Sequence, residues 1–481
     1  MTQAARHHAF LIVGPMAVMA VLSACAQFDL EQGLHRANAD TRAATQSTPH
    51  SDWQLARTDE QNRQRLQAAQ ELLAQPIGQT QAVQLMLANS PAFQAMLAQY
   101  WMQAAAAAQS GRIANPLFTF ERLVTGPGQE FNRFLSFGLL DVLTLAPRAD
   151  IAKSRIEEAQ IRVAAEVVDR ITQVRQAWVM AVAAQQTLQY ARQVMDSAQA
   201  SAELARRMQA VGNFNRITRA RHQAFYTDAA AQVVVAQQLS LSRREELVRL
   251  LGLDEAQAAQ LTLPERLPEV PTTPLADAEI GHLASRQRLD VQLARASLQT
   301  AARMQGLTGV TRYTDIELSA RRGSVTDRAT GQRNASSGYE VGVRLPVFDW
   351  GDLRRDAMNA QTLAAARQLE ATLRNAASGL RESYGAYRSA HDISRQYKDE
   401  VLPLRQLIAD ENVLRYNAMQ IGVFELLADA RDQISVVSAA IQADQQFWLA
   451  EAALQAQLLG RPVGAPMLAA TVGASAAPAG H

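Results

Sequence analysis

The chain has 481 residues, of which 48% are hydrophobic and 6% are aromatic. Lys and Arg number 47 and Asp and Glu number 46, so the formal net charge is +1. This balance gives no general electrostatic reason to expect nucleic acid or a strongly acidic partner. Plentiful Ala and Gln with few aromatics favour closely packed helices over one large globular core.

Residues 1–24 have the pattern of a signal peptide. Arg6 precedes an apolar run from Ala9 to Leu22, which is too short for a membrane span. The run ends in Leu22-Ser23-Ala24-Cys25, and Cys25 is the only cysteine of the sequence. Small residues before a lone Cys resemble a bacterial lipobox, which predicts an S-diacylglycerol and an N-palmitoyl group on Cys25 and no other cofactor. Ala26 in place of an Asp favours the outer membrane, and an ordinary signal peptide with an incidental Cys is the alternative.

Residues 25–78 are polar and are predicted to form a lipid-anchored arm of extended chain and short helices. A first repeat is predicted over residues 79–263, and its helical periodicity begins near Thr80. Ser90 and Pro91 suit the cap and the first turn of a helix, so a second helix is expected from Pro91 to about Gln109.

Two strand hairpins are predicted, at about residues 116–140 and 312–348. In the first, Leu117–Arg122 alternates in polarity, a loop follows at 125–128, and the chain returns from Phe131. In the second, a polar, Gly-rich loop is expected from about Gly323 to Ser337. Each strand would have roughly 8–11 residues, about the length that a tilted strand needs to cross a bilayer.

Long helices fill the rest of both halves. The segment 150–211 contains neither Gly nor Pro over 62 residues, which predicts long helices at 150–251. Four prolines mark a linker at 264–275, and a second repeat is predicted over 276–462. Its helices are expected at about 276–305 and then over 351–459, in the pieces 351–400, 403–419 and 423–459. The tail 463–481 is rich in Ala, Gly and Pro and is predicted to be disordered.

The two halves repeat one pattern. Gly212-Asn213-Phe214 followed by Ala220-Arg221 returns 210 positions later as Gly422-Val423-Phe424 followed by Ala430-Arg431. Repeats of one supersecondary unit are typical of stacked or ring-closed architectures. The sequence therefore predicts two internal structural repeats, each combining a strand hairpin with long helices.

The four predicted strands of one chain cannot close a barrel, and an open sheet edge in a membrane leaves backbone groups unpaired at high cost. Three chains would supply twelve antiparallel strands, and helices continuing from every strand would form a tube. The expected fold class is therefore an α+β membrane protein. In it, a homotrimer forms a 12-stranded transmembrane β-barrel and a long α-helical periplasmic barrel. A soluble protein whose hairpins pack on helices is the alternative.

Several short segments occur in a characteristic order. They are Leu87-Ala88-Asn89-Ser90-Pro91, Asn115-Pro116-Leu117, Leu251-Gly252, the run from Leu345 to Gly351, Arg415-Tyr416-Asn417-Ala418, Phe424-Glu425-Leu426-Leu427 and Leu459-Gly460. In this order and doubled layout the sequence resembles the outer-membrane efflux proteins of the TolC type, and the lipobox fits their lipoprotein members. The resemblance implies a homotrimer in the outer membrane that extends into the periplasm. It also implies a periplasmic adaptor and an inner-membrane pump as partners.

The resemblance further implies an aperture at the inner turn of each repeat, near Gly212 and Gly422. Tyr416 matches a Tyr of the family pattern and Glu425 matches its first acidic position, whereas Ala428 stands where a second acid is often found. Tyr416 and Glu425 are therefore expected to line the aperture, with Glu425 in an anionic ring. A solvated surface Glu is the alternative. Gly212 and Gly422 are expected to allow a tight turn or close adaptor contact, or only to end helices.

No motif indicates an enzyme. The histidines at 222, 282 and 391 are isolated, so no catalytic residue and no metal site are expected. The expected function is a passive trimeric duct that carries substrates from the adaptor and pump to the exterior. A periplasmic coiled-coil lipoprotein scaffold or adaptor without a pore is the alternative. The substrate stays open among drugs, metal ions, organic compounds and polypeptides, because in this family the pump largely selects it.

Overall fold

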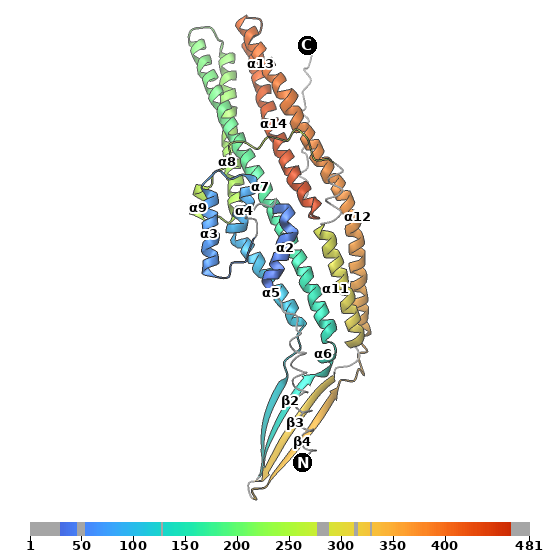
Figure 1. Cartoon of the computed structure of the whole chain (residues 1–481). Coiled ribbons are helices and arrows are strands. Elements are labelled where there is room, and N and C mark those ends of the chain that lie inside the picture. Colours follow the sequence, from blue (N-terminus) through green and yellow to red (C-terminus); the bar gives the residue numbers. More distant parts are fainter. Residues whose placement is uncertain are drawn as a thin grey trace. The chain divides into compact units, whose positions relative to one another are not determined.

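The computed structural model describes residues 29–45, 53–126, 128–276, 288–311, 316–327 and 330–462 (Figure 1). The predicted signal peptide 1–24, Cys25 and the predicted tail 463–481 lie outside the described residues. Internal contacts divide the chain into two compact units. Unit 1 comprises Met1–Ala37, Ala98–Val163 and Val291–Leu373, and unit 2 comprises Asn38–Leu97, Ala164–Asp290 and Arg374–His481. Each unit therefore takes residues from both predicted repeats.

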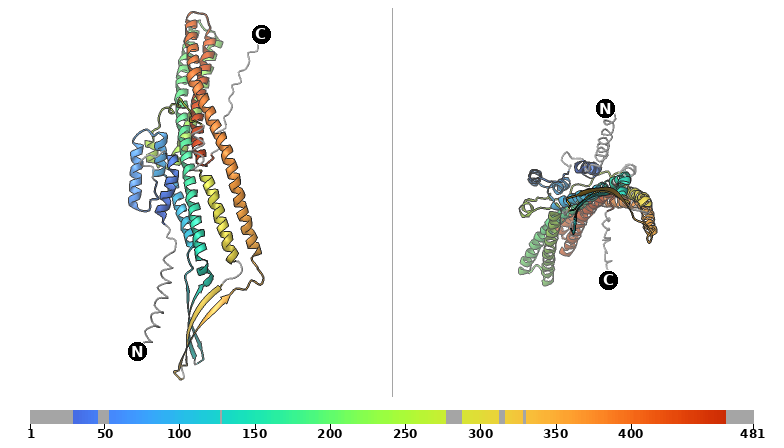
Figure 2. Two further views of the ribbon diagram at one scale, coloured as in Figure 1. Left: turned by 45° about the vertical axis from the view of Figure 1, so that its right-hand side comes forward. Right: turned by 90° about the horizontal axis from the view of Figure 1, so that it is seen from below.

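Unit 1 contains one antiparallel sheet that combines both predicted hairpins. Its strands are β1 (Leu117–Thr125), β2 (Gly128–Gly138), β3 (Ile316–Asp327) and β4 (Arg333–Val343). They pair in the order β1-β2-β3-β4, so β2 and β3, from different halves of the sequence, lie side by side (Figure 2). Both hairpins form where the alternation of polarity predicts them.

The second hairpin differs from its prediction in the extent of its loop. The sequence predicts a loop from about Gly323 to Ser337, but β3 continues to Asp327 and β4 begins at Arg333. The connection is short, and the Asp327 amide donates to the Gln332 carbonyl at 3.0 Å. The predicted loop is therefore wrong in extent, because pairing with a neighbouring strand outweighs the weak strand propensity of Gly, Ser and Asn.

The helices of unit 1 connect to the ends of the strands. Helix α5 (Pro91–Ser110) precedes β1, α6 (Leu139–Leu143) and α7 (Leu145–Ala210) follow β2, α11 (Leu289–Thr311) precedes β3, and α12 (Asp352–Gln396) follows β4. Arg148 fixes one of these junctions. Its guanidinium contacts the Asp141 carboxylate and donates to the carbonyls of Ser110 and Arg112 at 3.3 and 3.2 Å. One side chain therefore joins the ends of α5, α6 and α7.

Helix α7 has 66 residues, so at 1.5 Å per residue it is about 100 Å long. It starts earlier than residue 150, the predicted start, and includes Pro147. A proline is tolerated there because amides of the first turn have no acceptor within the helix. In unit 1, α7 contacts α11 where Arg303 donates to the Asp150 carbonyl at 2.9 Å.

Unit 2 consists of helices and the Pro-rich linker. Besides parts of α2 (Leu30–Thr45), α5, α7 and α12, it contains α3 (Asp59–Leu73), α4 (Gln79–Asn89), α8 (Arg216–Leu251), α9 (Glu255–Gln260), α13 (Leu402–Asn417) and α14 (Val423–Leu458). Trp178 of α7 is 1% exposed, and its indole N–H donates to the Ile77 carbonyl at 2.7 Å. This buried aromatic anchors the segment before α4 on α7. None of the helices that the structure describes is long and apolar enough to cross a bilayer.

Charged groups fix the end of α14 to α7. Arg461 donates two hydrogen bonds to the Asp169 carboxylate, one of them from Nε at 2.8 Å. Farther along the same pair of helices, Arg175 contacts Gln455 and lies near the buried Glu451. Burial raises the pKa of Glu451, and the Arg175 guanidinium opposes this rise. The two side chains therefore depend on each other, because either one alone would be an uncompensated buried charge.

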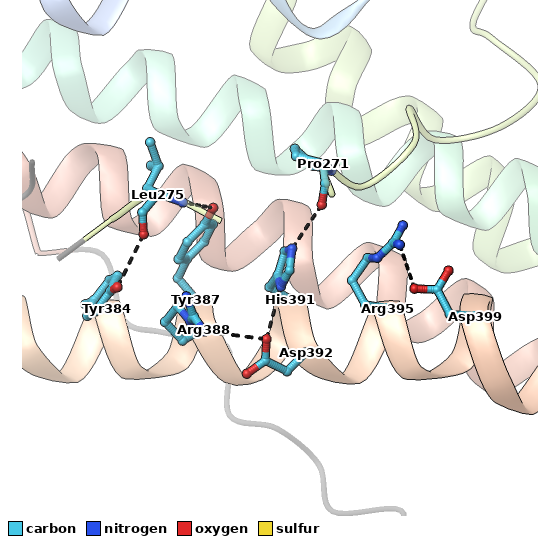
Figure 3. Close-up of polar contacts among 9 residues, drawn as sticks. All are labelled: Pro271, Leu275, Tyr384, Tyr387, Arg388, His391, Asp392, Arg395 and Asp399. Atoms are coloured by element: carbon cyan, nitrogen blue, oxygen red, sulfur yellow. Dashed lines mark hydrogen bonds and ion pairs between the residues drawn. The ribbon is translucent and has the colours of Figure 1, made fainter. Parts of the chain in front are cut away.

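The Pro-rich linker lies against α12 (Figure 3). The Leu275 amide donates to the Tyr387 hydroxyl at 3.2 Å, and Tyr384 donates to the Leu275 carbonyl at 3.3 Å. One turn farther along α12, His391 Nε2 lies 2.9 Å from the Pro271 carbonyl oxygen. A linker rich in proline cannot form its own regular hydrogen bonds, so side chains of α12 satisfy these backbone groups.

A π-helical turn, η1 (Tyr397–Val401), joins α12 to α13. Pro403 follows it in the first turn of α13. Because proline has no amide hydrogen and its ring crowds the preceding turn, a wider turn accommodates it without a break. The sequence predicts two helices separated near residue 402, whereas the structure keeps the path continuous by changing the hydrogen-bond spacing.

Gly252 ends α8 in a left-handed conformation with φ of 69°. A Cβ at this position would lie 2.6 Å from Pro91 Cδ and 2.8 Å from Ser90 Cα. The Asn89 amide group donates to the Gly252 carbonyl at 2.8 Å. The junction of α4 and α5 therefore packs directly on the backbone of Gly252.

We expect Gly252→Ala to lower the free energy of unfolding by roughly 2 kcal/mol or more, because left-handed strain and backbone overlap add. Gly385→Ala is the matched control, since Gly385 lies inside α12 with no atom within 4 Å of an added Cβ. The control should raise stability by about 0.5–1 kcal/mol. Denaturant unfolding followed by circular dichroism measures both variants, and equal effects would contradict this role of Gly252.

Candidate functional site

The sheet has two outer edges, on β1 and β4, that pair with no other strand among the described residues. All residues of these two strands are exposed. Large apolar side chains are among them, including Phe118 at 62% and Tyr339 at 85% exposure. Exposed strand edges with apolar side chains are templates for pairing with another chain. One copy therefore leaves two rows of backbone donors and acceptors unsatisfied.

The register separates the strand residues into two faces of different chemistry. Directly opposed residues of neighbouring antiparallel strands share a face, as in the row Phe118, Leu135, Ala320 and Tyr339. We call the face with this row the apolar face. On this face the three rows nearest the helices are apolar. The first row contains Ile316 and Val343, and the second contains Phe137, Leu318 and Val341. The third is the row that begins with Phe118.

The opposite face carries every acidic residue of the four strands and is called the carboxylate face. These residues are Glu121, Glu130, Glu317, Asp327 and Glu340. Asn132 donates to the Glu121 carboxylate at 3.1 Å, and Arg321 donates to the Asn132 side-chain oxygen at 3.2 Å. These cross-strand contacts agree with the register, because all three residues belong to this face.

The strands have the dimensions of membrane-spanning strands. They contain 9, 11, 12 and 11 residues from β1 to β4. A tilted strand of about 9–11 residues crosses the hydrocarbon layer. Strands that are apolar on one face and polar on the other suit a barrel wall with lipid outside and water inside.

Two helical turns at one end of unit 2 carry the other predicted site residues (Figure 1). The first turn joins α7 to α8. Gly212 adopts a left-handed φ of 81°, and the Asn213 amide donates to the Met208 carbonyl at 2.9 Å. Asn215 then caps α8 by accepting a hydrogen bond from the Thr218 amide at 2.8 Å.

The second turn joins α13 to α14 with the same geometry but different residues. Met419 takes the left-handed position with φ of 59°, and the Gln420 amide donates to the Arg415 carbonyl at 2.8 Å. Gly422 instead precedes α14 as its N-cap, with φ of −88°. Structurally equivalent positions of the two turns are thus 207 residues apart in the sequence. The helix starts Arg216 and Val423 have the same separation, which differs from the 210 that matching residue identities gives. Gly212 and Gly422 therefore lie in corresponding turns but not at corresponding positions.

Tyr416 and Glu425 flank the second turn. Tyr416 lies in the last turn of α13 and is 36% exposed, and its carbonyl accepts from the Met419 amide at 2.9 Å. Glu425 lies in the first turn of α14, where an acidic side chain is favourable to the helix dipole. It is exposed and has no ion-pair partner among the described residues. The turn therefore presents an aromatic and an acidic side chain together at one tip.

The two helix pairs that end in these turns contact each other. Val194, Ala198 and Ala229 of α7 and α8 form a buried cluster that Ile434 of α14 joins. The Arg431 guanidinium lies 5.0 Å from the centre of the Phe225 ring. The sequence identifies Arg431 only as part of the repeat, because a contact between distant helices leaves no local spacing.

His222 of α8 is a buried group that its sequence neighbourhood does not reveal. Its Nδ1 lies 2.7 Å from the Ser201 hydroxyl oxygen, and its ring stacks on Phe214 with a centroid distance of 6.0 Å. Its Nε2 is buried without a hydrogen-bond partner among the described residues. Burial lowers the pKa of His222. The part of the chain that the structure describes contains no group of three or more His, Cys, Asp or Glu side chains suited to a metal ion.

The lowered pKa of His222 predicts that acid weakens this helix pair. Unfolded His binds a proton near pH 6.5, above the folded pKa, so the stabilisation is complete above that pH and is lost as the pH falls through the folded value. We expect His222→Phe to flatten the dependence of the thermal midpoint on pH between about 7 and 5. His35→Gln, at an exposed position of α2, is the control and should keep the wild-type slope. An unchanged slope in His222→Phe would contradict the assignment.

No protein-family profile and no curated protein matches this chain. Solved structures do match. A membrane protein from Pseudomonas aeruginosa is 17% identical with a TM-score of 0.67, over 79% of this chain and 93% of its own. The CmeC outer membrane channel of Campylobacter jejuni is 14% identical with a TM-score of 0.65, over 83% and 86%. The outer membrane protein VceC of Vibrio cholerae is 16% identical with a TM-score of 0.64, over 80% and 96%.

At these identities the matches establish the fold. The chain has the fold of the outer membrane factor channels. The TolC-type fold that the sequence predicts is therefore confirmed. Since most of both chains is covered, the shared fold includes the helices as well as the sheet.

Proposed function

We propose that this chain is an outer membrane channel, the passive duct of a tripartite efflux system. The observation that carries the proposal is a four-stranded sheet with two open edges, one apolar face and one carboxylate face. Closed into a ring, such sheets would turn the apolar face to lipid and the carboxylates to a water-filled lumen. The shared fold with known outer membrane channels supports the same role.

Three copies suit a duct better than two. Two copies would give eight strands, and an eight-stranded barrel is largely filled by its own side chains. Three copies would give twelve strands, an even number within the range of outer membrane barrels, and a wider interior. Pairing β1 of one copy with β4 of the next would satisfy both open edges. Helices that continue from the strands would then form the periplasmic helical barrel.

The proposed location is the outer membrane, with the long helices in the periplasm. A lipid on Cys25 would add an anchor to the barrel, and the small residues Ser23 and Ala24 before it support this modification. A periplasmic adaptor and an inner-membrane pump are the proposed partners. The pump would supply the energy and most of the substrate selection, so the duct itself needs no catalytic residue.

The two helical turns of unit 2 are proposed to form the periplasmic aperture. Glu425 from three copies would form an anionic ring, with Tyr416 beside it. The exposed positions of both side chains, on either side of one turn, support this assignment. Gly212 and Gly422 are open to solvent, with no atom within 4 Å of an added Cβ, which leaves room for an adaptor.

The mature protein, purified in detergent, should migrate as a heat-sensitive trimer on seminative gels and should conduct ions in planar bilayers. A barrel completed by three copies resists dissociation because every strand edge is then paired. A stable monomer that needs no detergent would overturn the channel and favour the periplasmic scaffold.

Replacing the acid at the proposed aperture should alter conduction. Glu425→Gln in all copies should reduce cation selectivity roughly threefold or more, since each close charge contributes on the order of 1 kcal/mol. Glu245→Gln, at an exposed position of α8 away from the turns, is the control and should conduct like the wild type. Reversal potentials in a salt gradient measure both variants. The aperture assignment fails if selectivity is the same in all three proteins.

The lipid anchor is tested by metabolic labelling with palmitate in cells. Wild-type protein should incorporate the label, and Cys25→Ser should incorporate none, because Cys25 is the only thiol. Labelling that persists in the variant would place the lipid elsewhere, and an unlabelled wild type would indicate an ordinary signal peptide.

A further inference from the structure

Most of the basic residues of the sheet lie on the face opposite to the acidic ones. Of the five arginines in the strands, Arg122, Arg133, Arg322 and Arg333 lie on the apolar face, and only Arg321 lies on the carboxylate face. Every carboxylate of the strands lies on the side opposite to these four. We call the four residues the arginine belt.

The arginine belt occupies the half of the apolar face that is farther from the helices. Arg133 and Arg322 are directly opposed in the row that follows Leu135 and Ala320. Arg122, opposite Phe131, is one row farther out, and Arg333, opposite Thr326, lies in the row after that. From the helices outward, three apolar rows are thus followed by three rows that each contain arginine.

This arrangement is unfavourable without an anion. Like charges directly opposite each other on neighbouring strands destabilise a sheet, and Arg133 faces Arg322. All four belt side chains are exposed, and none forms an ion pair with a carboxylate of the described residues. Arg122 stacks at 5.7 Å on the Phe131 ring, which leaves its N–H groups available for an anion. Guanidinium groups bind phosphate with paired hydrogen bonds.

The position along the strands indicates the source of the anion, and this step rests on the proposed function. In a closed barrel the apolar face meets lipid, where an arginine costs about 2–4 kcal/mol at the midplane and little at the interface. The belt runs from the middle of the strands, where Arg133 is the sixth of the 11 residues of β2, to the ends next to the hairpin turns, where Arg333 begins β4. Arginine side chains extend along apolar surface toward the nearer interface, so the belt would reach the headgroups of the outer leaflet. A free phosphate would contact the arginines alone, whereas a lipid would also place its acyl chains on the apolar rows.

We propose that the arginine belt binds phosphorylated lipid headgroups of the outer leaflet, with the acyl chains of the same lipid against the apolar rows of β1–β4. The ligand class is a lipid with phosphomonoester groups. Each copy would contribute one belt, so a closed trimer would be surrounded by such sites. Binding would weaken with added salt, because exposed charges at an interface are screened.

The test uses the full mature protein in neutral detergent, titrated with diphosphoryl lipid A or with its dephosphorylated form. Native mass spectrometry measures the lipid bound per protein. The double variant Arg133→Gln/Arg322→Gln should lose affinity for the phosphorylated lipid about tenfold or more. Arg321→Gln is the matched control, adjacent in sequence but on the carboxylate face, and should bind within about twofold of the wild type. Arg133→Lys/Arg322→Lys keeps the charge without the paired hydrogen bonds and should fall between them.

Five outcomes decide between the proposals. Equal losses in Arg321→Gln and the double variant would overturn it, because general charge would then be the cause. Equal binding of both lipid forms would also overturn it. So would inorganic phosphate that competes for the protein as well as the phosphorylated lipid does, because the acyl chains would then contribute nothing to binding. If the protein trimerises and conducts yet does not prefer the phosphorylated lipid, the channel proposal is supported and the lipid-binding proposal is overturned. If the protein binds this lipid through Arg133 and Arg322 but forms no conducting trimer, the lipid-binding proposal is supported and the channel proposal is overturned.

Discussion

Backbone hydrogen bonding at the edges of the sheet is the constraint on which the rest of this protein depends. β1 and β4 each pair on one side only. In the proposed outer-membrane location no water would be present to satisfy the other side, so the sheet would need neighbouring strands from further copies. The 66-residue helix α7 has no such requirement, because its hydrogen bonds lie within it. A barrel wall with lipid on one side and water on the other, as we propose, would account for the placement of every strand carboxylate on one face.

Much of the fold could be predicted because its signals are local. Alternation in Leu117–Arg122 predicts a strand, and the lack of Gly and Pro over 150–211 predicts most of α7. The pairing of β2 with β3 could not be predicted, because it joins segments that no short-range pattern relates. The strand residues within 323–337 could not be predicted for a similar reason. Gly, Ser and Asn have weak strand propensity, and pairing with a neighbouring strand holds them extended.

Of the candidate site, the sequence could indicate the turns but not their alignment or packing. Gly212 and Gly422 correctly indicate two turns, but matching residue identities misaligns them, because Met419 takes the left-handed position without being Gly. The burial of His222 and the contact of Arg431 with Phe225 depend on tertiary packing and leave no trace in residue spacing. The sorting of arginines needs the register of all four strands, so it appears only when the sheet is known.

The neighbouring residues Arg321 and Arg322 point to opposite sides of the sheet. A single-residue insertion or deletion inside β3 would therefore move every residue beyond it to the opposite face, placing acids on the apolar face and apolar side chains on the carboxylate face. Insertions or deletions of two residues would keep every residue on its face and alter only the length of the strands. During divergence, this sheet should thus tolerate even-numbered length changes within its strands and any length change in its hairpin turns.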